Sequence, residues 1–431
     1  MTLTLVICAV TVLLMVLSIF FVPLIRIGKF QMGGYCFFAL VGAIALLALG
    51  CVAPRPLLEG IFAASAVNPV KILVLFLTMT VFSVFLDELG FFRYLAAVAL
   101  RWAGRSQRTL FFLLYAVVSV LTVFTSNDII ILTFTPFICA FSRHAGIDPL
   151  PYLFAEFFAA NTWSMALLIG NPTNIYIASF LGMDFFSYLG VMWLPTLCAG
   201  TVSIGILYLL FRARLRVPIT AEPLTPEPVR ERTLLTVSLC HLLLCIVLLS
   251  VASYIALEMW WISLSLSVTL FAFVLIYRRR RRERPVILLR TLRRMPWELV
   301  PFMLSMFTVV IALEQNGVLT LLASWLGDRA PIAVYGTTSF LTANLINNIP
   351  MSVLFANLAQ TVGLPAAAYA AIIGSNLGAC LTPVGALAGI MWADILRRER
   401  IPFDYRDFLR VGALTSLPAL LAALGGLALV L

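Results

Sequence analysis

The sequence contains very little charge. Only 11% of its 431 residues are Asp, Glu, Lys or Arg, and 62% are hydrophobic. A typical soluble domain has roughly 25% charged residues. Apolar runs of about 20 residues, the length that crosses a bilayer as an α-helix, recur from end to end. The sequence therefore predicts an all-α polytopic membrane protein and leaves no room for a sizeable soluble domain.

Histidines and catalytic patterns are also scarce. His144 and His241 are the only histidines, and neither has a ligand partner at close spacing, which argues against a zinc site. The eight cysteines show no metal-type spacing, so we interpret them as small buried residues. For Cys380 the alternative is contact with a thiophilic solute such as trivalent arsenic. No Ser/His/Asp set, Walker loop or dinucleotide fingerprint occurs, so we expect no cofactor, no metal and no enzyme active site.

Lysine is rare as well, with only Lys29 and Lys71 among 29 basic residues. The net charge of +10 comes from arginines in short gaps between apolar runs, a distribution that reports topology and not nucleic-acid binding. These gaps are expected to face the cytoplasm. Residues 1–24 lack a basic region and a cleavage site, so we expect a retained first helix.

The second half of the sequence repeats the polar residues of the first inside apolar runs. Polar groups at mid-membrane depth are costly unless they line a cavity. Two copies in opposite orientation are what a secondary transporter needs for alternating access. The matched segments are Asp87-Glu88-Leu89-Gly90 with Glu314-Gln315-Asn316-Gly317, Ser126-Asn127-Asp128 with Ile346-Asn347-Asn348, and Asn161 and Gly170 with Asn376 and Gly385.

Two of the apolar segments are expected to be re-entrant hairpins. Residues 109–142 begin and end on the basic side, so the chain turns back at Ser126-Asn127-Asp128. The mirror segment, 332–362, begins and ends on the opposite side, and Pro350 prevents a continuous helix there. The segments 152–180 and 366–395 contain Gly and Pro near their centres and should be broken helices.

The chain is therefore expected to form an inverted repeat of about ten transmembrane helices plus two hairpins. The repeats would cover 1–216 and 233–431, joined by a cytoplasmic linker at 217–232. The helices are expected near 3–24, 34–53, 72–103, 152–180, 188–211, 234–255, 259–277, 297–328, 366–395 and 407–430.

Each hairpin tip should form a binding site with the broken helix of its own half, because both expose backbone groups that have lost helical partners. Such groups, with Asn, Ser and Thr, can hold ions or small oxo-acids. The first set is Ser126, Asn127, Asp128, Asn161, Gly170, Asn171, Thr173 and Asn174, and the second is Asn344, Asn347, Asn348, Ser375, Asn376, Thr382, Pro383 and Gly385.

Carboxylates in the membrane are functional candidates because a buried charge is costly there. Asp128 is the first choice for a proton or cation carrier, since its repeat counterpart, Asn348, is neutral; the alternative is a structural role in capping the hairpin. Asp87 and Glu314 are further candidates for proton coupling, although a structural role at a helix break fits them equally well. Glu156 is a weaker candidate, because it could lie near an end of its long helix.

At these residues the sequence resembles the ion transporter superfamily, and within it the arsenical-pump permeases. The resemblance covers almost the whole chain. It rests on Phe85-Leu86-Asp87-Glu88-Leu89-Gly90-Phe91-Phe92, Asn127-Asp128 with Ile131-Leu132-Thr133 and Pro136, Asn347-Asn348-Ile349-Pro350, and Leu381-Thr382-Pro383-Val384-Gly385-Ala386-Leu387-Ala388 with Trp392. Two stretches resemble other branches: Thr125-Ser126-Asn127-Asp128 is similar to a motif of sodium-coupled dicarboxylate carriers, and Gly170-Asn171-Pro172-Thr173-Asn174 to one of sodium/proton antiporters.

The resemblance implies an elevator-type transporter in the bacterial inner membrane that exports arsenite or antimonite, driven by the proton-motive force. It also implies a homodimer and allows a partner ATPase. The alternatives are a sodium-coupled carrier of a dicarboxylate or another anion, and a sodium/proton antiporter. An integral-membrane enzyme or a receptor is a further alternative, disfavoured by the absence of a nucleophile-base set.

Overall fold

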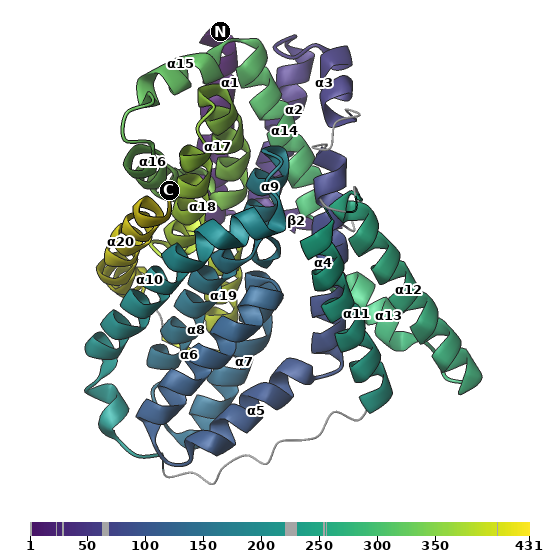
Figure 1. Ribbon diagram of the computed structural model, residues 1–431, viewed down its shortest axis with the longest axis vertical. Coiled ribbons are helices and arrows are strands. Elements are labelled where there is room, and N and C mark those ends of the chain that lie inside the picture. Colours follow the sequence, from purple (N-terminus) through teal and green to yellow (C-terminus); the bar gives the residue numbers. More distant parts are fainter. Residues whose placement is uncertain are drawn as a thin grey trace.

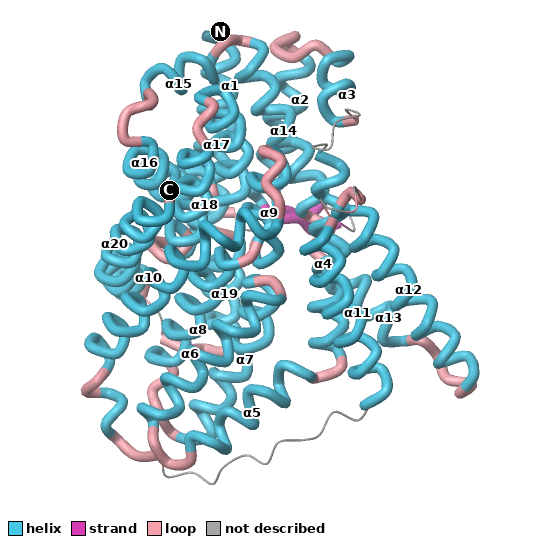
Figure 2. Tube along the Cα trace, viewed as in Figure 1, coloured by secondary structure: helices cyan, strands magenta, loops and turns pink. Residues whose placement is uncertain are grey.

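The computed structural model describes residues 2–22, 24–27, 30–62, 69–219, 231–252, 255, 257–402 and 404–431. Nearly all of these residues are helical, and Figures 1 and 2 show the helices packed side by side. Within this part of the chain, seven helices are long and apolar enough to cross a membrane. The expected all-α polytopic membrane fold is confirmed. Lys29 and most of the predicted linker lie outside the described residues.

The first half runs from α1 to α10 and includes the first hairpin and the first broken helix. The only strands among the described residues, β1 and β2, pair antiparallel, with Leu24 opposite Gly33; no strand was predicted there. The bounds are α1 Thr2–Phe21, β1 Leu24–Ile27, β2 Phe30–Gly33, α2 Gly34–Ala48, α3 Pro54–Ile61, α4 Pro69–Glu88, α5 Phe91–Ala103, α6 Gln107–Phe124, α7 Asn127–Ala145, α8 Leu150–Trp163, η1 Ser164–Ala166, η2 Leu168–Gly170, α9 Pro172–Phe180, α10 Phe185–Phe211 and η3 Arg214–Arg216.

The second half contains the same succession of α-helices as the first. The short amphipathic helix α13 occupies the same position in this succession as α3 does in the first half. Figure 1 shows α5, α6 and α7 toward the lower end of the molecule and α15, α16 and α17 toward the upper end. The bounds are α11 Arg232–Val251, α12 Met259–Arg280, α13 Val286–Arg294, α14 Leu299–Gln315, α15 Val318–Leu326, α16 Pro331–Ile346, α17 Asn348–Val362, α18 Pro365–Gly378, η4 Pro383–Gly385, α19 Leu387–Arg398 and α20 Tyr405–Val430.

Two helices that the sequence predicted as continuous are broken. The segment 72–103 divides into α4 and α5, and 297–328 divides into α14 and α15. Each break has a glycine in the left-handed region, Gly90 with φ 80° and Gly317 with φ 70°. Glycine adopts this conformation without steric cost. The polar residues before each glycine, Asp87-Glu88 and Glu314-Gln315-Asn316, are the signal in the sequence that marks these breaks.

The hairpins and the broken helices pack together as one group. Hairpin helix α7 packs on α8 and α19, α16 packs on α18, and α17 packs on α9 and α18. A second group contains α4 with α11, α12 and α13, which lie to the right in Figure 1. Helix α4 also contacts α7 and α9, and α14 contacts α17. The two groups therefore meet where α4 packs against α7 and α9.

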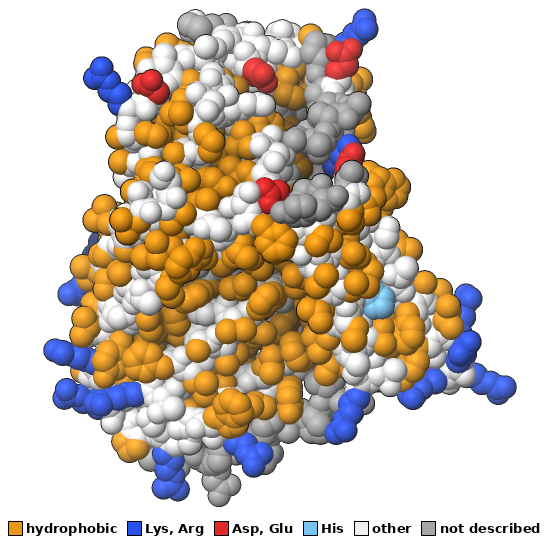
Figure 3. Space-filling model, in the orientation of Figure 1, with side chains coloured by type: hydrophobic (Ala, Val, Ile, Leu, Met, Phe, Trp, Pro, Cys, Tyr) orange, Lys and Arg blue, Asp and Glu red, His pale blue; other side chains and the backbone are white. Residues whose placement is uncertain are grey.

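The surface separates apolar from charged residues. On the face drawn in Figure 3, hydrophobic side chains cover the middle of the molecule, Lys and Arg gather mainly along its lower edge, and Asp and Glu lie in its upper part. This distribution is compatible with the predicted sidedness, in which the basic gaps face the cytoplasm. The sidedness itself stays a prediction.

Candidate functional site

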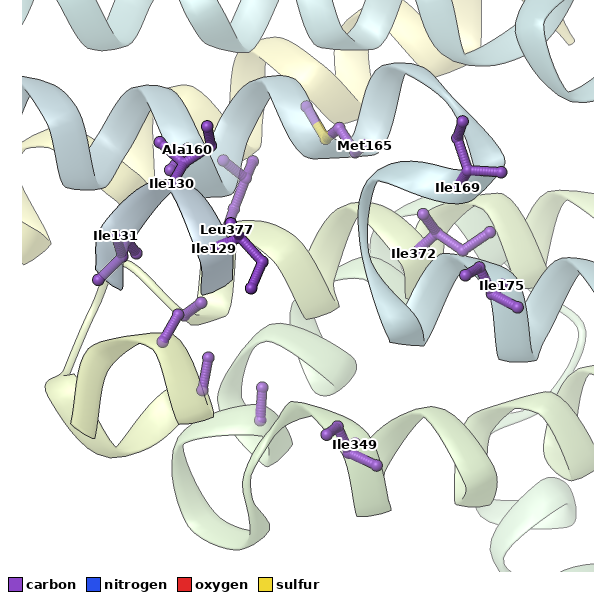
Figure 4. Close-up of a cluster of buried hydrophobic side chains, with 14 of the residues drawn as sticks. Ile129, Ile130, Ile131, Ala160, Met165, Ile169, Ile175, Ile349, Ile372 and Leu377 are labelled. Atoms are coloured by element: carbon purple, nitrogen blue, oxygen red, sulfur yellow. The ribbon is translucent and has the colours of Figure 1, made fainter. Parts of the chain in front are cut away.

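The candidate site lies where α7 and α17 begin and where the two broken helices are interrupted. Between α8 and α9 the chain forms η1 and η2, and between α18 and α19 it forms η4. Figure 4 shows the apolar residues around this region, among them Ile129, Ala160, Ile349 and Leu377, which come from both halves of the chain. Each of these four is a neighbour in sequence of a polar residue discussed below. The polar groups are therefore held within a packed apolar core.

The first hairpin tip is bonded to the first broken helix. The Nδ2 atom of Asn127 donates to Oδ1 of Asn161 over 3.1 Å, and Nδ2 of Asn161 donates to the carbonyl of Phe157. Asn127 and Asn161 are 1% and 0% exposed. The Oδ1 atom of Asn127 has no hydrogen-bond partner in the described part of the chain. The tip therefore keeps one buried acceptor available for a ligand.

Asn376 joins the two halves and belongs to the first site. Its Oδ1 accepts from Nδ2 of Asn171 and from Oγ of Ser164, both at 2.9 Å, and its Nδ2 donates to Oδ1 of Asn174 over 2.7 Å. The sequence placed Asn376 with the second hairpin, which is wrong. The side chain bonds across the repeat because α18 packs against α9, η1 and α8.

The break in the first broken helix requires glycine. A Cβ atom on Gly170 would lie 2.2 Å from the carbonyl oxygen of Ser164. The next residue, Asn171, is the N-cap of α9, and its Oδ1 accepts from the backbone N–H of Thr173. Nδ2 of Asn174 donates to the carbonyls of Ser164 and Leu167, which have lost their helical partners.

The second half builds a similar but separate arrangement. Nδ2 of Asn344 donates to the carbonyl of Gly378, and its Oδ1 accepts from Oγ1 of Thr382 over 2.6 Å. Asn347 donates from Nδ2 to the carbonyl of Val384 over 3.1 Å. The second tip is thus bonded to the second broken helix, as the first tip is to the first. Four members of the predicted set are buried there without any of these bonds: Asn348, Ser375, Pro383 and Gly385.

Asp128 is the second residue of α7 and is partly accessible. Within the described residues its carboxyl has no hydrogen bond or ion pair. It interacts electrostatically with Tyr35 of α2, which also interacts with Glu298. The caps of α7 and α17 are Ser126 and Asn347, so in helix register Asp128 corresponds to Ile349 and not to Asn348. The carboxyl still has no ionisable counterpart in the other half.

A small cavity of about 10 Å³ lies between the first tip and α4. Thr80 and Ser83 of α4 face Thr125 and Ser126 of the tip across it. Four hydroxyl-bearing residues thus line the cavity, which we call the hydroxyl cavity, and no charged residue is among its described lining. The rest of the lining is Phe76, Met79, Ile169, Pro172 and Ile175.

Two predicted coupling residues lie outside this site. The Asp87 carboxyl is paired with Arg294 over 2.6 Å, and the same guanidinium contacts Glu88 over 2.8 Å. Glu314 is exposed at the end of α14. Arg294 is more than 200 residues from Asp87 in the sequence, so the pairing could not be predicted.

Sequence reasoning missed several residues that the structure brings to the site. Thr80 and Ser83 lie in an apolar run, and their recurrence on one helix is the signal that could have identified them. Ser164 was overlooked between Asn161 and Gly170. Tyr35 and Glu298 carry no recognisable motif.

No metal centre is evident in the described chain. It contains no group of three His, Cys, Asp or Glu side chains that could hold a metal ion. All eight cysteines are reduced, and Cys380 is fully buried. A neighbour of Cys380 is Tyr115, whose hydroxyl donates to the carbonyl of Gly200. Cys380 therefore lies in the packed interior and outside the lining of the hydroxyl cavity.

Known proteins resemble the chain over most of its length. It is 28% identical to the arsenical pump membrane protein of Yersinia enterocolitica over 368 residues, which cover 82% of this chain and 85% of the relative. The arsenical pump membrane protein of Escherichia coli K12 gives the same identity and coverage. A putative arsenical pump membrane protein of Bacillus subtilis is 25% identical, over 78% of this chain and 82% of the relative.

Solved structures support the same fold. The crystal structure of the YdaH transporter of Alcanivorax borkumensis, described as having an unusual topology, matches 99% of this chain and 97% of its own with a TM-score of 0.58 and 14% identity. A family model described as citrate transporter matches residues 34–371. The predicted membership of the ion transporter superfamily is confirmed. The chain is a multi-pass membrane transporter that belongs to the citrate transporter family.

Proposed function

We propose that this transporter exports arsenite or antimonite. The observation that carries the proposal is the chemistry of the first tip, where Thr125 and Ser126 line the hydroxyl cavity and the next two residues are Asn127, whose Oδ1 has no partner in the described chain, and Asp128. Arsenite and antimonite are neutral trihydroxy acids at neutral pH, so their O–H groups can donate to these acceptors. A carboxylate offers only acceptors and is bound by basic side chains. The cavity lining contains none.

The size of the cavity also supports a small solute. About 10 Å³ is roughly the room that one water molecule needs. A small movement of the tip away from α4 would admit a three-hydroxyl acid. Citrate, the solute in the name of the family model, would require several such volumes. The names of the 28% identical relatives agree with the smaller solute.

We further propose that protons drive the export and that Asp128 carries them. The carboxyl is partly accessible and has no fixed partner within the described residues, so it can gain and lose a proton as its surroundings change. A sodium ion would need several oxygen ligands. At both helix breaks the carbonyls of Ser164, Leu167, Gly378 and Val384 already accept from asparagine amides. Each of these carbonyl oxygens keeps one lone pair, so the feature that supports proton coupling is the carboxyl of Asp128 itself.

The matched succession of helices supports an inverted repeat that works as an elevator. The hairpins and broken helices would move as one body past the group around α4, carrying the site between the two sides. We expect a homodimer in the inner membrane, where the proton-motive force acts. A partner ATPase, if one binds, would add to proton coupling, so purified protein alone should still transport.

The test replaces Asp128 by Asn in purified protein reconstituted into liposomes. We expect the wild type to move arsenite against an imposed pH gradient and Asp128→Asn to lose the dependence on the gradient. The matched control is Asp184→Asn, a loop carboxyl that caps α10 and that asparagine can replace as a cap. Unchanged coupled flux in Asp128→Asn would contradict the proton assignment.

A sodium-coupled carrier of a dicarboxylate or another anion such as citrate is the second candidate, favoured by the family model, which is described as citrate transporter. A ligand that binds only the folded state raises its stability. Thermal unfolding of the detergent-purified protein should therefore shift with arsenite and not with sodium plus citrate. The opposite pattern would replace the first proposal by the second.

A further inference from the structure

Helix α8 carries a buried carboxyl that the proposed coupling through Asp128 does not use. Glu156 is the seventh residue of α8 and is 0% exposed. Its Oε1 accepts from Oγ1 of Thr135 over 2.8 Å, and Oε2 has no hydrogen bond of ordinary length within the described chain. The side chain of Trp392 on α19 interacts with the same carboxyl. The expectation that Glu156 lies near a helix end is wrong.

The surroundings of Glu156 contain no basic partner among the described residues. Cys139 of α7 is the titratable group that interacts with it. Helices α6, α10 and α18 also pack on α8. Tyr115 of α6 and Tyr188 of α10 each donate a hydroxyl hydrogen bond to a backbone carbonyl. Helix α18 carries no charged residue. A carboxylate without a cation is disfavoured in such a place, so the neutral acid is the resting form.

The site can nevertheless hold the ionised form for a short time. The Thr135 hydroxyl donates to Oε1, and the Trp392 indole N–H is a donor that has no acceptor capacity. Both are suited to a carboxylate. The neutral acid can donate its O–H to Oγ1 of Thr135, since a hydroxyl also accepts, so both protonation states find a partner at this position.

Helix α7 connects Glu156 to both ends of the first hairpin. Asp128, Thr135, Cys139 and Arg143 are spaced by seven, four and four residues, which places them along one face of the helix. The stripe is about 22 Å long at 1.5 Å per residue. Thr135 contacts Glu156, and Cys139 interacts with Glu156 and also with Arg143 and Glu399.

The far end of this stripe opens into a cavity of about 510 Å³. Arg143 is paired there with Glu399 over 2.9 Å, and both side chains are partly exposed. The cavity is also lined by Ile147, Pro149, Arg398, Arg400 and Ile401. It lies at the end of α7 that carries the basic residues, opposite to the hairpin tip.

We propose that Glu156 is a second proton carrier, in series with Asp128 along α7, which exchanges its proton with water in the cavity beside Arg143 and Glu399. The inference rests on the proposed proton-coupled function. In each cycle the carboxylate takes a proton from the side of Asp128, becomes a neutral acid, and later returns the proton to water in the cavity. No bond other than the O–H bond is made or broken.

The first test is infrared difference spectroscopy of the full-length protein in detergent. A buried neutral carboxyl gives a C=O stretching band distinct from that of a carboxylate. We expect this band to respond to arsenite addition in the wild type and to be reduced in Glu156→Gln, which keeps the acceptor for Thr135. Glu59→Gln is the control, because Glu59 is an exposed carboxylate on α3. A band unchanged in Glu156→Gln would refute a neutral Glu156.

The second test measures protons moved per arsenite in liposomes. Because every proton would pass through both carriers in series, this ratio should fall toward zero in Glu156→Gln while arsenite exchange without a gradient continues, an outcome that a merely structural residue would not give. An unchanged ratio, with exchange intact, overturns the proposal. If Glu156→Gln fails to fold, Thr135→Val serves instead, and the same infrared band should then shift. Absence of proton coupling in the wild type would refute the proposed function itself, whereas the infrared result decides the state of Glu156 separately.

Discussion

Asn376 offers the sharpest test of how the site is held together. Replacing it by Ala removes an amide that is 0% exposed and that contacts Ser164, Asn171 and Asn174 in the other half of the chain. The Nδ2 of Asn171 and the Oδ1 of Asn174 that face Asn376 would lose these partners. Ser164 is less affected, because its hydroxyl also bonds to the carbonyl of Asn161.

The loss of stability can be estimated from these two polar groups that lose their hydrogen-bond partners. A buried polar group left without a partner costs about 1–3 kcal/mol, so two of them cost about 2–6 kcal/mol. Hydrogen bonds measured inside membrane proteins average only about 0.6 kcal/mol, which for three lost bonds gives about 2 kcal/mol. We therefore expect Asn376→Ala to lower the free energy of unfolding by at least about 2 kcal/mol.

Unfolding in mixed micelles, followed by circular dichroism as the denaturing detergent is increased, measures this loss. The matched control is Thr201→Ala, because the Thr201 hydroxyl is exposed and bonds only to carbonyls of its own helix. That change should stay within about 0.5 kcal/mol. If Asn376→Ala were no more destabilising than Thr201→Ala, the amide network would not hold the halves together.

Two further predictions concern the first half. Gly170→Ala should lower the free energy of unfolding by about 1–3 kcal/mol and impair transport, because the new Cβ would meet the Ser164 carbonyl at 2.2 Å. The control is Gly190→Ala, where nothing lies within 4 Å, and it should be neutral or slightly stabilising in the same mixed-micelle unfolding assay. Equal effects of the two changes would refute the steric reasoning. Asp184→Ala should cost about 1 kcal/mol at neutral pH through loss of the α10 cap. The hydrogen bonds from Ser187 lower the pKa of Asp184 in the folded protein. The carboxylate therefore stabilises the fold fully above the unfolded pKa of about 3.9, and this stabilisation is lost as the pH falls through the folded pKa. If the destabilisation caused by Asp184→Ala grew as the pH fell, the sign of this argument would be wrong.

Much of the fold could be predicted because membrane spans are read from length and hydropathy. The hairpin turns at Ser126 and Asn347 and the helix breaks near Gly170 and Gly385 coincide with the polar residues that interrupt the apolar runs. The breaks at Gly90 and Gly317 also follow polar residues, but the expected helices 72–103 and 297–328 continued through them, because glycine occurs in many continuous membrane helices. Hydropathy also cannot distinguish a short strand pair, such as β1 and β2, from a loop.

The candidate site could be predicted only as far as local pairs. Asn127 with Asn161 and Asn344 with Thr382 lie within 40 residues of each other, and the repeat brings them together. The role of Asn376 depends on how α18 packs against α9 and η1, which no pattern in the sequence records. The burial of Glu156 is also set by packing, in this case by α7 and α19.

The bond between Asn171 and Asn376 also has a consequence for biosynthesis, because it spans 205 residues. At 5–20 residues per second, the ribosome needs about 10–40 s to make Asn376 after Asn171. During that time the first half is already entering the membrane with these amides unpaired. The candidate site is thus among the last parts of the protein to form, and a chain truncated before residue 376 would expose polar groups that cellular quality control can recognise.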